Sequence, residues 1–101
     1  MRTIWPEKDP GESLIATFDF SPELEVGESI PSATCTVSAV IGTDDDAADM
    51  LYTDLSIYGG NVFQRFRGGL EGVTYNLRCA AMTSAGRILV LSAQLPVRVL
   101  L

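Results

Sequence analysis

The sequence contains no histidine in its 101 residues. This absence removes the most common general base, the Ser-His catalytic pairings and the zinc sites that use imidazole. Carboxylate pairs are the remaining route to acid–base catalysis, and no pair stands at a spacing typical of that chemistry. We therefore expect a protein that is not an enzyme and has no catalytic residues.

Long apolar runs are also missing. No run approaches the roughly 20 apolar residues that a membrane-spanning helix requires. No apolar segment follows Arg2 in the way that a secretory signal would require. We expect synthesis in the cytoplasm and no membrane contact, and the length suits a single hydrophobic core.

Positive charge is scarce. The net charge is −6, with 12 of the 13 acidic residues in 1–54 and five of the seven basic residues in 55–101. An acidic chain is a poor nucleic-acid binder, so the alternation of Arg65 and Arg67 around Phe66 indicates an exposed basic strand face rather than base stacking. The uneven charge could orient copies head to tail, or acidic and basic strands could simply be neighbours in one sheet.

Two local motifs are candidates for a phosphate loop and a calcium loop, but neither has the residue pattern that such a loop requires. The glycines at 59–60, 68–69 and 72 are followed by no Gly-Lys-Ser/Thr, so turns explain them. The aspartates within 44–49 are consecutive and lack the alternating spacing of a calcium loop, so a solvated loop is favoured. We expect neither a cofactor nor a metal.

Alternation with a period of two dominates the chain and predicts strands. Gly59-Gly60 and the Ser-Ala-Gly at 84–86 are typical of hairpin turns. Together with the absence of an amphipathic helix, these signals predict an all-β fold, an immunoglobulin-like antiparallel β-sandwich of six to seven strands. We assign it to residues 13–101, after an extended N-terminal segment at 1–12. The expected strands cover 13–20, 33–40, 51–58, 61–66, 73–81 and 87–95.

The same alternation predicts which side chains face the core. One face of each strand is apolar, and the other carries hydroxyl, amide or charged groups. The residues expected inside are Leu14, Ala16, Phe18, Phe20, Ala33, Cys35, Val37, Ala39, Val73, Tyr75, Leu77, Cys79 and Ala81.

Tyr75 and the two cysteines suggest how the sandwich is built. Tyr75 follows a glycine-rich corner, and in sandwich domains such a tyrosine ties down the preceding loop through its hydroxyl. Cys35 and Cys79 would occupy strands B and F of an immunoglobulin domain, although Tyr75 precedes Cys79 by four residues where antibodies have two. A reducing compartment favours free thiols, and a disulfide stays open as the alternative.

The last strand is apolar on both faces, with Leu89 and Leu91 on one face and Ile88 and Val90 on the other, and it leads into the C-terminal segment QLPVRVLL. One half-buried strand does not need two apolar faces. Pro96 cannot donate to a ladder, so the strand should bend or lie at an edge there. We interpret the surplus as an interface with another chain or copy, by edge pairing or tail packing. The alternative is a tail that folds back over its own sheet. The candidate interface residues are Pro96, Val97, Val99 and Leu100.

An ordered series of short motifs carries a family resemblance. The chain resembles the phage fibre adaptor family, small immunoglobulin-like tail- and fibre-associated proteins of tailed bacteriophages and prophages. Phe20 stands where the family suggests tryptophan, Cys35 stands where an aromatic is usual, and the acidic insertion at 44–49 looks particular to this chain. The matching segments are KDPGE, FDFSPEL, EVGESI, SATCTV, RGGLEGVTYNL and TSAGRILVLSAQLPV.

The resemblance implies a non-enzymatic virion component, made in the bacterial cytoplasm and then assembled into the phage tail. Its partners would be phage tail or fibre proteins, and homo-oligomer formation remains open. A ligand-binding module for glycans or another host-surface group is the alternative function. That module would use Trp5, Tyr52 and Tyr58, which are dispersed in the sequence.

Overall fold

The computed structural model describes residues 3–101. Its regular structure is β-strand apart from two single turns of 3-10 helix, so the prediction of an all-β fold is confirmed. Among these residues, no helix has the length and apolarity needed to cross a membrane. The strands are β1 (Thr3–Ile4), β2 (Ser13–Asp19), β3 (Ser32–Ile41), β4 (Ser56–Tyr58), β5 (Asn61–Arg67), β6 (Thr74–Met82) and β7 (Ile88–Pro96), and the 3-10 turns are η1 (Ser21–Glu23) and η2 (Ala47–Met50).

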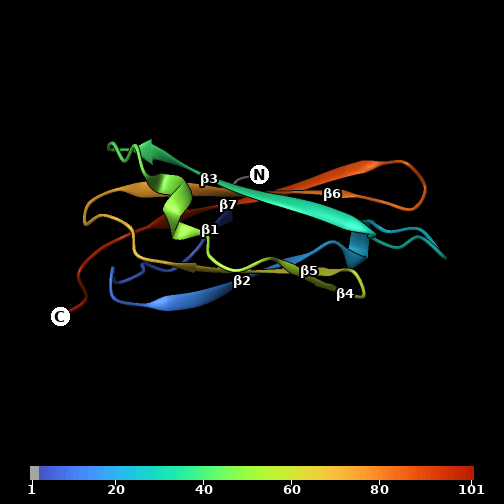
Figure 1. Cartoon of the computed structure of the whole chain (residues 1–101), viewed down its shortest axis with the longest axis horizontal. Helices are drawn as coiled ribbons and strands as arrows, with labels where there is room; N and C mark the ends of the chain where they lie inside the picture. Colours follow the sequence, from blue (N-terminus) through green and yellow to red (C-terminus); the bar gives the residue numbers. More distant parts are fainter. Residues whose placement is uncertain (1–2) are drawn as a thin grey trace.

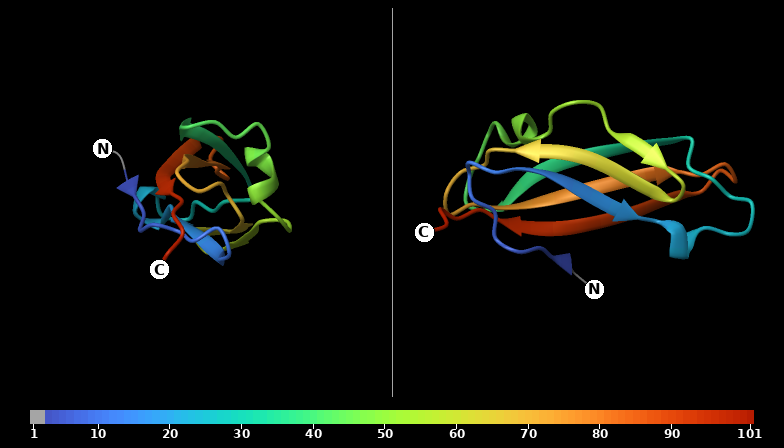
Figure 2. Two further views of the ribbon diagram at one scale, coloured as in Figure 1. Left: turned by 90° about the vertical axis from the view of Figure 1, so that its left-hand side faces the viewer. Right: turned by 90° about the horizontal axis from the view of Figure 1, so that it is seen from below.

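The strands form two sheets that lie face to face (Figures 1 and 2). One sheet has the order β1-β7-β6-β3 and the other has the order β2-β5-β4. Neighbouring strands are antiparallel except for the short β1, which runs parallel to β7. The molecule measures 45 × 28 × 24 Å, and the long strands follow its longest axis (Figure 1).

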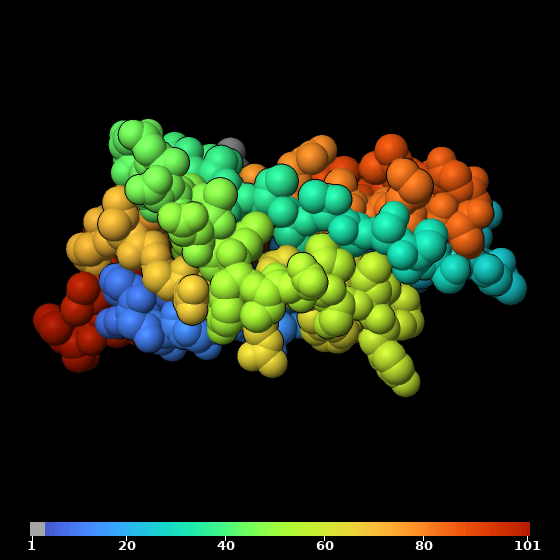
Figure 3. All heavy atoms as spheres, viewed as in Figure 1, coloured from blue at the N-terminus to red at the C-terminus, as the bar shows by residue number. Residues whose placement is uncertain are grey.

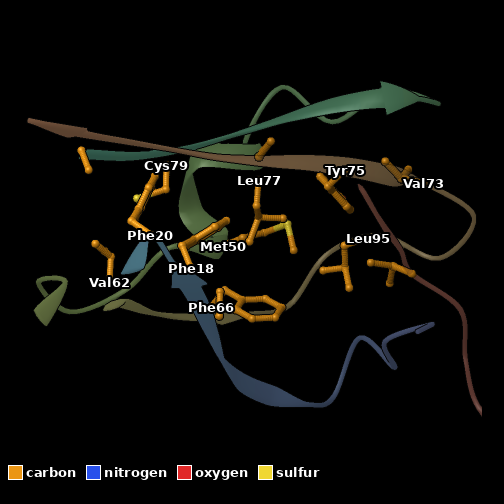
Figure 4. Packing of buried hydrophobic residues seen from close by; sticks show 14 of the residues in the cluster. Phe18, Phe20, Met50, Val62, Phe66, Val73, Tyr75, Leu77, Cys79 and Leu95 are labelled. Carbon is orange, nitrogen blue, oxygen red and sulfur yellow. The ribbon is translucent and has the colours of Figure 1, made fainter. Parts of the chain in front are cut away.

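The core lies between the sheets and is filled from both of them (Figure 4). All five inward residues expected in the stretch 73–81 are buried, and Tyr75 and Cys79 are completely inaccessible. Phe18 from β2 and Phe66 from β5 face them from the other sheet. Burying each large apolar side chain contributes about 1.5–3 kcal/mol, so this alternation drives the packing of one sheet on the other.

Two details of the second sheet differ from expectation. Leu14, expected inside, is 38% exposed because it lines an open groove beside Trp5 at the free edge of β2. The strand expected over 51–58 is present only as the short β4. Before it, the Gln64 amide donates to the carbonyl oxygens of Tyr52 at 3.3 Å and Thr53 at 3.2 Å, so a buried side chain takes the place of ladder partners.

The placement of the cysteines is a second correction. β3 and β6 are neighbours in the same sheet, and Cys35 lies directly opposite Cys79. The expectation that the two cysteines occupy strands B and F together is wrong, because those strands lie in opposite sheets of an immunoglobulin domain. Alternation identifies the buried face of a strand but does not identify the strand beside it.

Different segments of the chain lie at the two ends of the sandwich. At one end, the loop that follows β2 is tied to the β6–β7 hairpin, where Arg87 forms an ion pair with Glu28 and the Ser84 amide donates to the Ser29 carbonyl at 2.8 Å. We call this the hairpin end. The opposite end, which we call the tail end, holds the N-terminal segment 5–12, the glycine-rich corner at 68–72 and the C-terminal residues (Figure 1).

Candidate interaction surface at the tail end

Lys8, the single lysine of the chain, organises the tail end. It is fully buried, and its ammonium group donates to the carbonyl oxygens of Gly68 at 2.7 Å and Asp9 at 2.8 Å. Burial lowers the Lys8 pKa, against the opposing charges of Glu12 and Asp9. Lys8 therefore joins the N-terminal segment to the glycine-rich corner. Sequence patterns did not predict this role, although the one lysine of the chain stands in the KDPGE motif.

The backbone around Lys8 extends the first sheet. Its N–H donates to the Pro96 carbonyl and its carbonyl accepts the N–H of Arg98, both at 2.9 Å. β7 is thus covered by the N-terminal segment rather than lying at an edge, and Pro96 is its last residue, where a missing N–H costs little.

The C-terminal residues are then held by carboxylates on both sides. The Val99 N–H donates to Glu71 and the Leu100 N–H donates to Asp9, at 2.5 and 2.8 Å. The N–H groups of Gly11 and Leu100 lower the pKa of the Asp9 carboxyl. This arrangement fixes the backbone of the tail without covering its side chains.

The four candidate interface residues divide into two groups. Val97 is 1% exposed and Pro96 is half-buried, so Val97 belongs to the chain's own core. Val99 and Leu100 are 54% and 49% exposed, and Leu101 beyond them is open to solvent. The tail projects from the end of the molecule in Figures 1 and 3. An exposed aliphatic surface on an anchored backbone is suited to contact another protein.

Tyr75 closes the corner beneath the tail. Its hydroxyl accepts the Leu70 N–H at 2.8 Å and donates to Asp44 Oδ2 at 2.7 Å. Burial, followed by the hydrogen bond to the Asp44 carboxylate, raises the pKa of Tyr75 to about 12. The tyrosine holds the loop before it, as its position after the glycines suggested, and it also holds the acidic loop.

The acidic loop is more structured than the expected solvated loop. Ala47 and Met50 of η2 are buried in the core, whereas Asp45, Asp46 and Asp49 are exposed. Within the described chain, no group of three or more candidate ligands could hold a metal ion. The loop forms one wall of an open groove of about 650 Å³ at the tail end. The groove is lined by Pro10, Gly11, Glu12, Ser13, Asp44, Asp46, Asp49, Met50, Arg67, Gly68, Gly69 and Leu70.

The outer face of the first sheet is a second candidate surface. Met82, Ile88 and Val90 are 51%, 67% and 43% exposed there, which places the second apolar face of the last strand in solvent. Arg78 is the single charged residue in β3, β6 and β7. This surface is therefore nearly neutral in a chain whose charged residues are abundant elsewhere.

The aromatic residues considered for glycan binding do not all lie exposed. Trp5 is half-buried, with its ring 5.7 Å from Phe18 and 6.2 Å from Phe66. The guanidinium of Arg67 lies 4.5 Å above the Tyr52 ring, and Tyr58 is 82% exposed. Trp5 packs against the core and also lines the open groove beside Leu14, so Tyr58 is the one ring of the three that is exposed.

The alternation of Arg65 and Arg67 around Phe66 predicted an exposed basic face on this strand, and the structure has one. Arg65 and Arg67 are exposed, whereas Phe66 between them is buried in the core. A buried Phe66 ring cannot stack on a base, and the outward face of this strand carries Arg65 and Arg67 beside the half-buried Phe63.

The structure is thus an all-β domain of two packed sheets, with an apolar tail whose backbone is held by hydrogen bonds while Val99 and Leu100 are exposed. Comparison with known families then identifies it. The chain belongs to the family described as podophage GP4 fiber-tail adaptor protein gp77, whose model matches residues 8–96. No curated protein and no solved structure matches the chain significantly. The family is one of phage tail fibre adaptors, so the resemblance noted from the sequence is confirmed.

Proposed function

We propose that this chain is a non-enzymatic, immunoglobulin-like module that links or decorates phage tail and fibre proteins, and that it contacts them through its tail end. The single observation that carries the proposal is the anchored tail, in which Val99 and Leu100 are exposed while their N–H groups are held by Glu71 and Asp9. Pre-ordering a segment before it binds reduces the entropy lost on association.

Electrostatics supports the same surface. The groove beside the tail is lined by Glu12 and three aspartates, with Arg67 as its one basic side chain. A partner that combines an aliphatic patch with Lys or Arg side chains would complement both the tail and the groove. The family also supports tail or fibre proteins as these partners.

The strand order supports the immunoglobulin-like assignment. The sheets β2-β5-β4 and β7-β6-β3 correspond in order to the B-E-D and G-F-C sheets of immunoglobulin domains. Tyr75 near the start of β6 takes the place of the corner tyrosine of strand F. In this proposal residues 13–101 form the sandwich and the N-terminal segment 1–12, whose first two residues lie outside the described part, is fastened to the tail end by Lys8.

The family supports a place in the virion tail. Synthesis in the cytoplasm of an infected or lysogenic bacterium, followed by assembly into the particle, is the route that we propose. Self-association is a further part of the proposal. Association through charge would weaken as salt rises, whereas association through Val99 and Leu100 would persist.

A binding experiment with matched variants tests the proposal. Purified tail and fibre proteins of the same phage are immobilised in turn, and the wild-type chain is compared with Leu100→Asp and with Val26→Asp. Val26 is fully exposed in the loop between η1 and β3, which is tied to the β6–β7 hairpin, so its variant adds the same charge far from the tail. We expect Leu100→Asp to lose binding at least tenfold and Val26→Asp to retain it. Wild-type affinity in Leu100→Asp would overturn the tail-end interface.

Light scattering tests self-association. A chain shortened after Arg98 removes the exposed tail and keeps Val97, which the core requires. A full-length oligomer that becomes monomeric on shortening, at both low and high salt, would assign self-association to the tail. An oligomer that survives shortening would exclude it.

A further inference from the structure

Cys35 and Cys79 are 44 positions apart in the sequence and directly opposite one another in the antiparallel pair β3–β6. Opposed residues of such a pair have Cα atoms about 4.5–5.5 Å apart, which lies within the range that a disulfide spans. Neither cysteine is bonded to another in the structure. Because the two residues are opposed in the ladder, their side chains lie on the same face of the sheet, where opposed Cβ atoms are about 4.5–5.5 Å apart.

The two thiols differ in access to solvent. Cys79 is completely buried, whereas Cys35 is half-buried and lines an open groove of about 480 Å³ between β3 and the segment 51–55. Figure 3 shows this side of the molecule, with β3 above the light green segment. A small reagent can approach Cys35 through the groove, and it can reach Cys79 only after Cys35.

The electrostatics of the pair supports the same order of events. The neighbouring Cys79 thiol lowers the pKa of Cys35, and the same interaction, together with burial, raises the pKa of Cys79. The thiolate is the reactive form of cysteine, so Cys35 is the attacking group.

We propose that Cys35 and Cys79 form an oxidation site in which a small-molecule disulfide converts the pair to a cross-strand disulfide. The Cys35 thiolate attacks one sulfur of the reagent, forms a mixed disulfide and releases one thiolate. Cys79 then loses its proton and attacks the Cys35 sulfur, which releases the second half of the reagent. The pair loses two electrons and two protons, and the reagent becomes two thiols.

The bond would fasten an edge strand. β3 lies at the outside of its sheet, paired only with β6. The disulfide would close a covalent loop that contains η2, β4 and β5, and thereby restrict the unfolded chain. The inference concerns the isolated chain and does not depend on the proposed function.

Mass spectrometry of the native full chain tests the inference, with hydroxyethyl disulfide as an uncharged probe. We expect wild type to lose the mass of two hydrogens, with no adduct retained, and we expect peptide mapping to join Cys35 to Cys79. The denaturation midpoint should rise on oxidation and return after reduction. A retained adduct without the internal bond, or a bond formed only between two copies, would overturn the inference.

Two variants separate the roles of the thiols. In Cys79→Ala the adduct should remain on Cys35, because no second thiol displaces it. In Cys35→Ala the buried Cys79 should stay unmodified until urea unfolds the chain. Rapid modification of Cys79 in folded Cys35→Ala would contradict the proposed order. The wild-type mass and peptide map decide the central question even if a variant does not fold.

Discussion

The Tyr75 hydroxyl donates a hydrogen bond to Asp44 across 31 positions of sequence while accepting the N–H of Leu70. One buried oxygen atom thereby joins the acidic loop and the glycine-rich corner to β6. The acidic loop, which the sequence suggested was a solvated insertion, is in this way part of the fold at the tail end.

Replacing Tyr75 with Phe should reveal the strength of this junction. The ring would still fill its site, but Leu70 N–H and the Asp44 carboxylate would lose their partner. We expect a loss of about 1–3 kcal/mol in the free energy of unfolding, measured by urea titration. Asp44→Asn retains an acceptor for the hydroxyl and should cost less. Equal losses in the two variants would show that the bond to Leu70 contributes nothing.

The same tyrosine predicts a response to alkaline pH. Its pKa is raised to about 12 from an ordinary value of 10.0. A raised pKa in the folded state gives stability that is complete below the ordinary value and is lost as the pH rises through the raised value. The urea midpoint of wild type should therefore decrease as the pH is raised from the ordinary to the raised pKa. In Tyr75→Phe this decrease should be smaller. An identical pH profile for the two proteins would contradict the role of the phenol.

Gly68 and Gly69 provide a matched pair for testing the corner. Both have positive φ, 73° and 96°, so alanine at either position costs about 1–2 kcal/mol in backbone strain. A Cβ at Gly68 meets nothing within 4 Å, whereas one at Gly69 would lie 3.0 Å from Val97 Cγ2. Gly69→Ala should therefore lose about 1–3 kcal/mol more than Gly68→Ala in the free energy of unfolding. Equal losses would mean that Val97 moves aside freely.

Lys8→Met tests the buried ammonium group. The substitution keeps the length of the side chain but leaves the Gly68 carbonyl without its donor, so we expect a loss of about 1–3 kcal/mol in urea unfolding. Arg98→Met is the control. Arg98 is exposed and forms long ion pairs with Glu7 and Glu71, at 3.5 and 3.9 Å, and its removal should cost less than about 1 kcal/mol. A Lys8→Met protein as stable as wild type would show that Lys8 is dispensable.

The hairpin end should respond to acid. The ion pair and hydrogen bonds with Arg87 lower the pKa of Glu28 from 4.5 to about 2. A lowered pKa in the folded state gives stability that is complete above the ordinary value and is lost as the pH falls through the lowered one. The thermal unfolding temperature of wild type should decrease as the pH is lowered from the ordinary to the lowered pKa. The unfolding temperature of Glu28→Gln should lack this part of the decrease. Unchanged acid dependence in Glu28→Gln would exclude the pair as its source.

Local patterns in the sequence predicted much of the fold. The alternation in 73–81 gave the buried face of β6 correctly, and Gly59-Gly60 gave the hairpin between β4 and β5. The neighbour relation between Cys35 and Cys79 could not be obtained in this way, because a period of two defines a face and not a strand partner.

The tail end was hard to predict for a related reason. Lys8, Asp44 and Tyr75 come together only after the sheets pack, since their partners lie far away in sequence. Val97 and Val99 look alike in the sequence, yet one is buried and the other is exposed. Val97 packs against the glycine-rich corner, where a Cβ at Gly69 would lie 3.0 Å from its Cγ2, and no local signal in the tail reveals that contact.

The parallel pairing of the N-terminal segment with β7 has a mechanical consequence. Three backbone hydrogen bonds, Trp5 to Gln94 at 2.8 Å and Lys8 with Pro96 and Arg98 at 2.9 Å, link the two segments along the long axis. A force that pulls the two ends of the chain apart loads these bonds together, in shear, instead of opening them one at a time. The domain should therefore resist tension between its ends better than its few residues of parallel pairing suggest, and single-molecule pulling would measure that resistance.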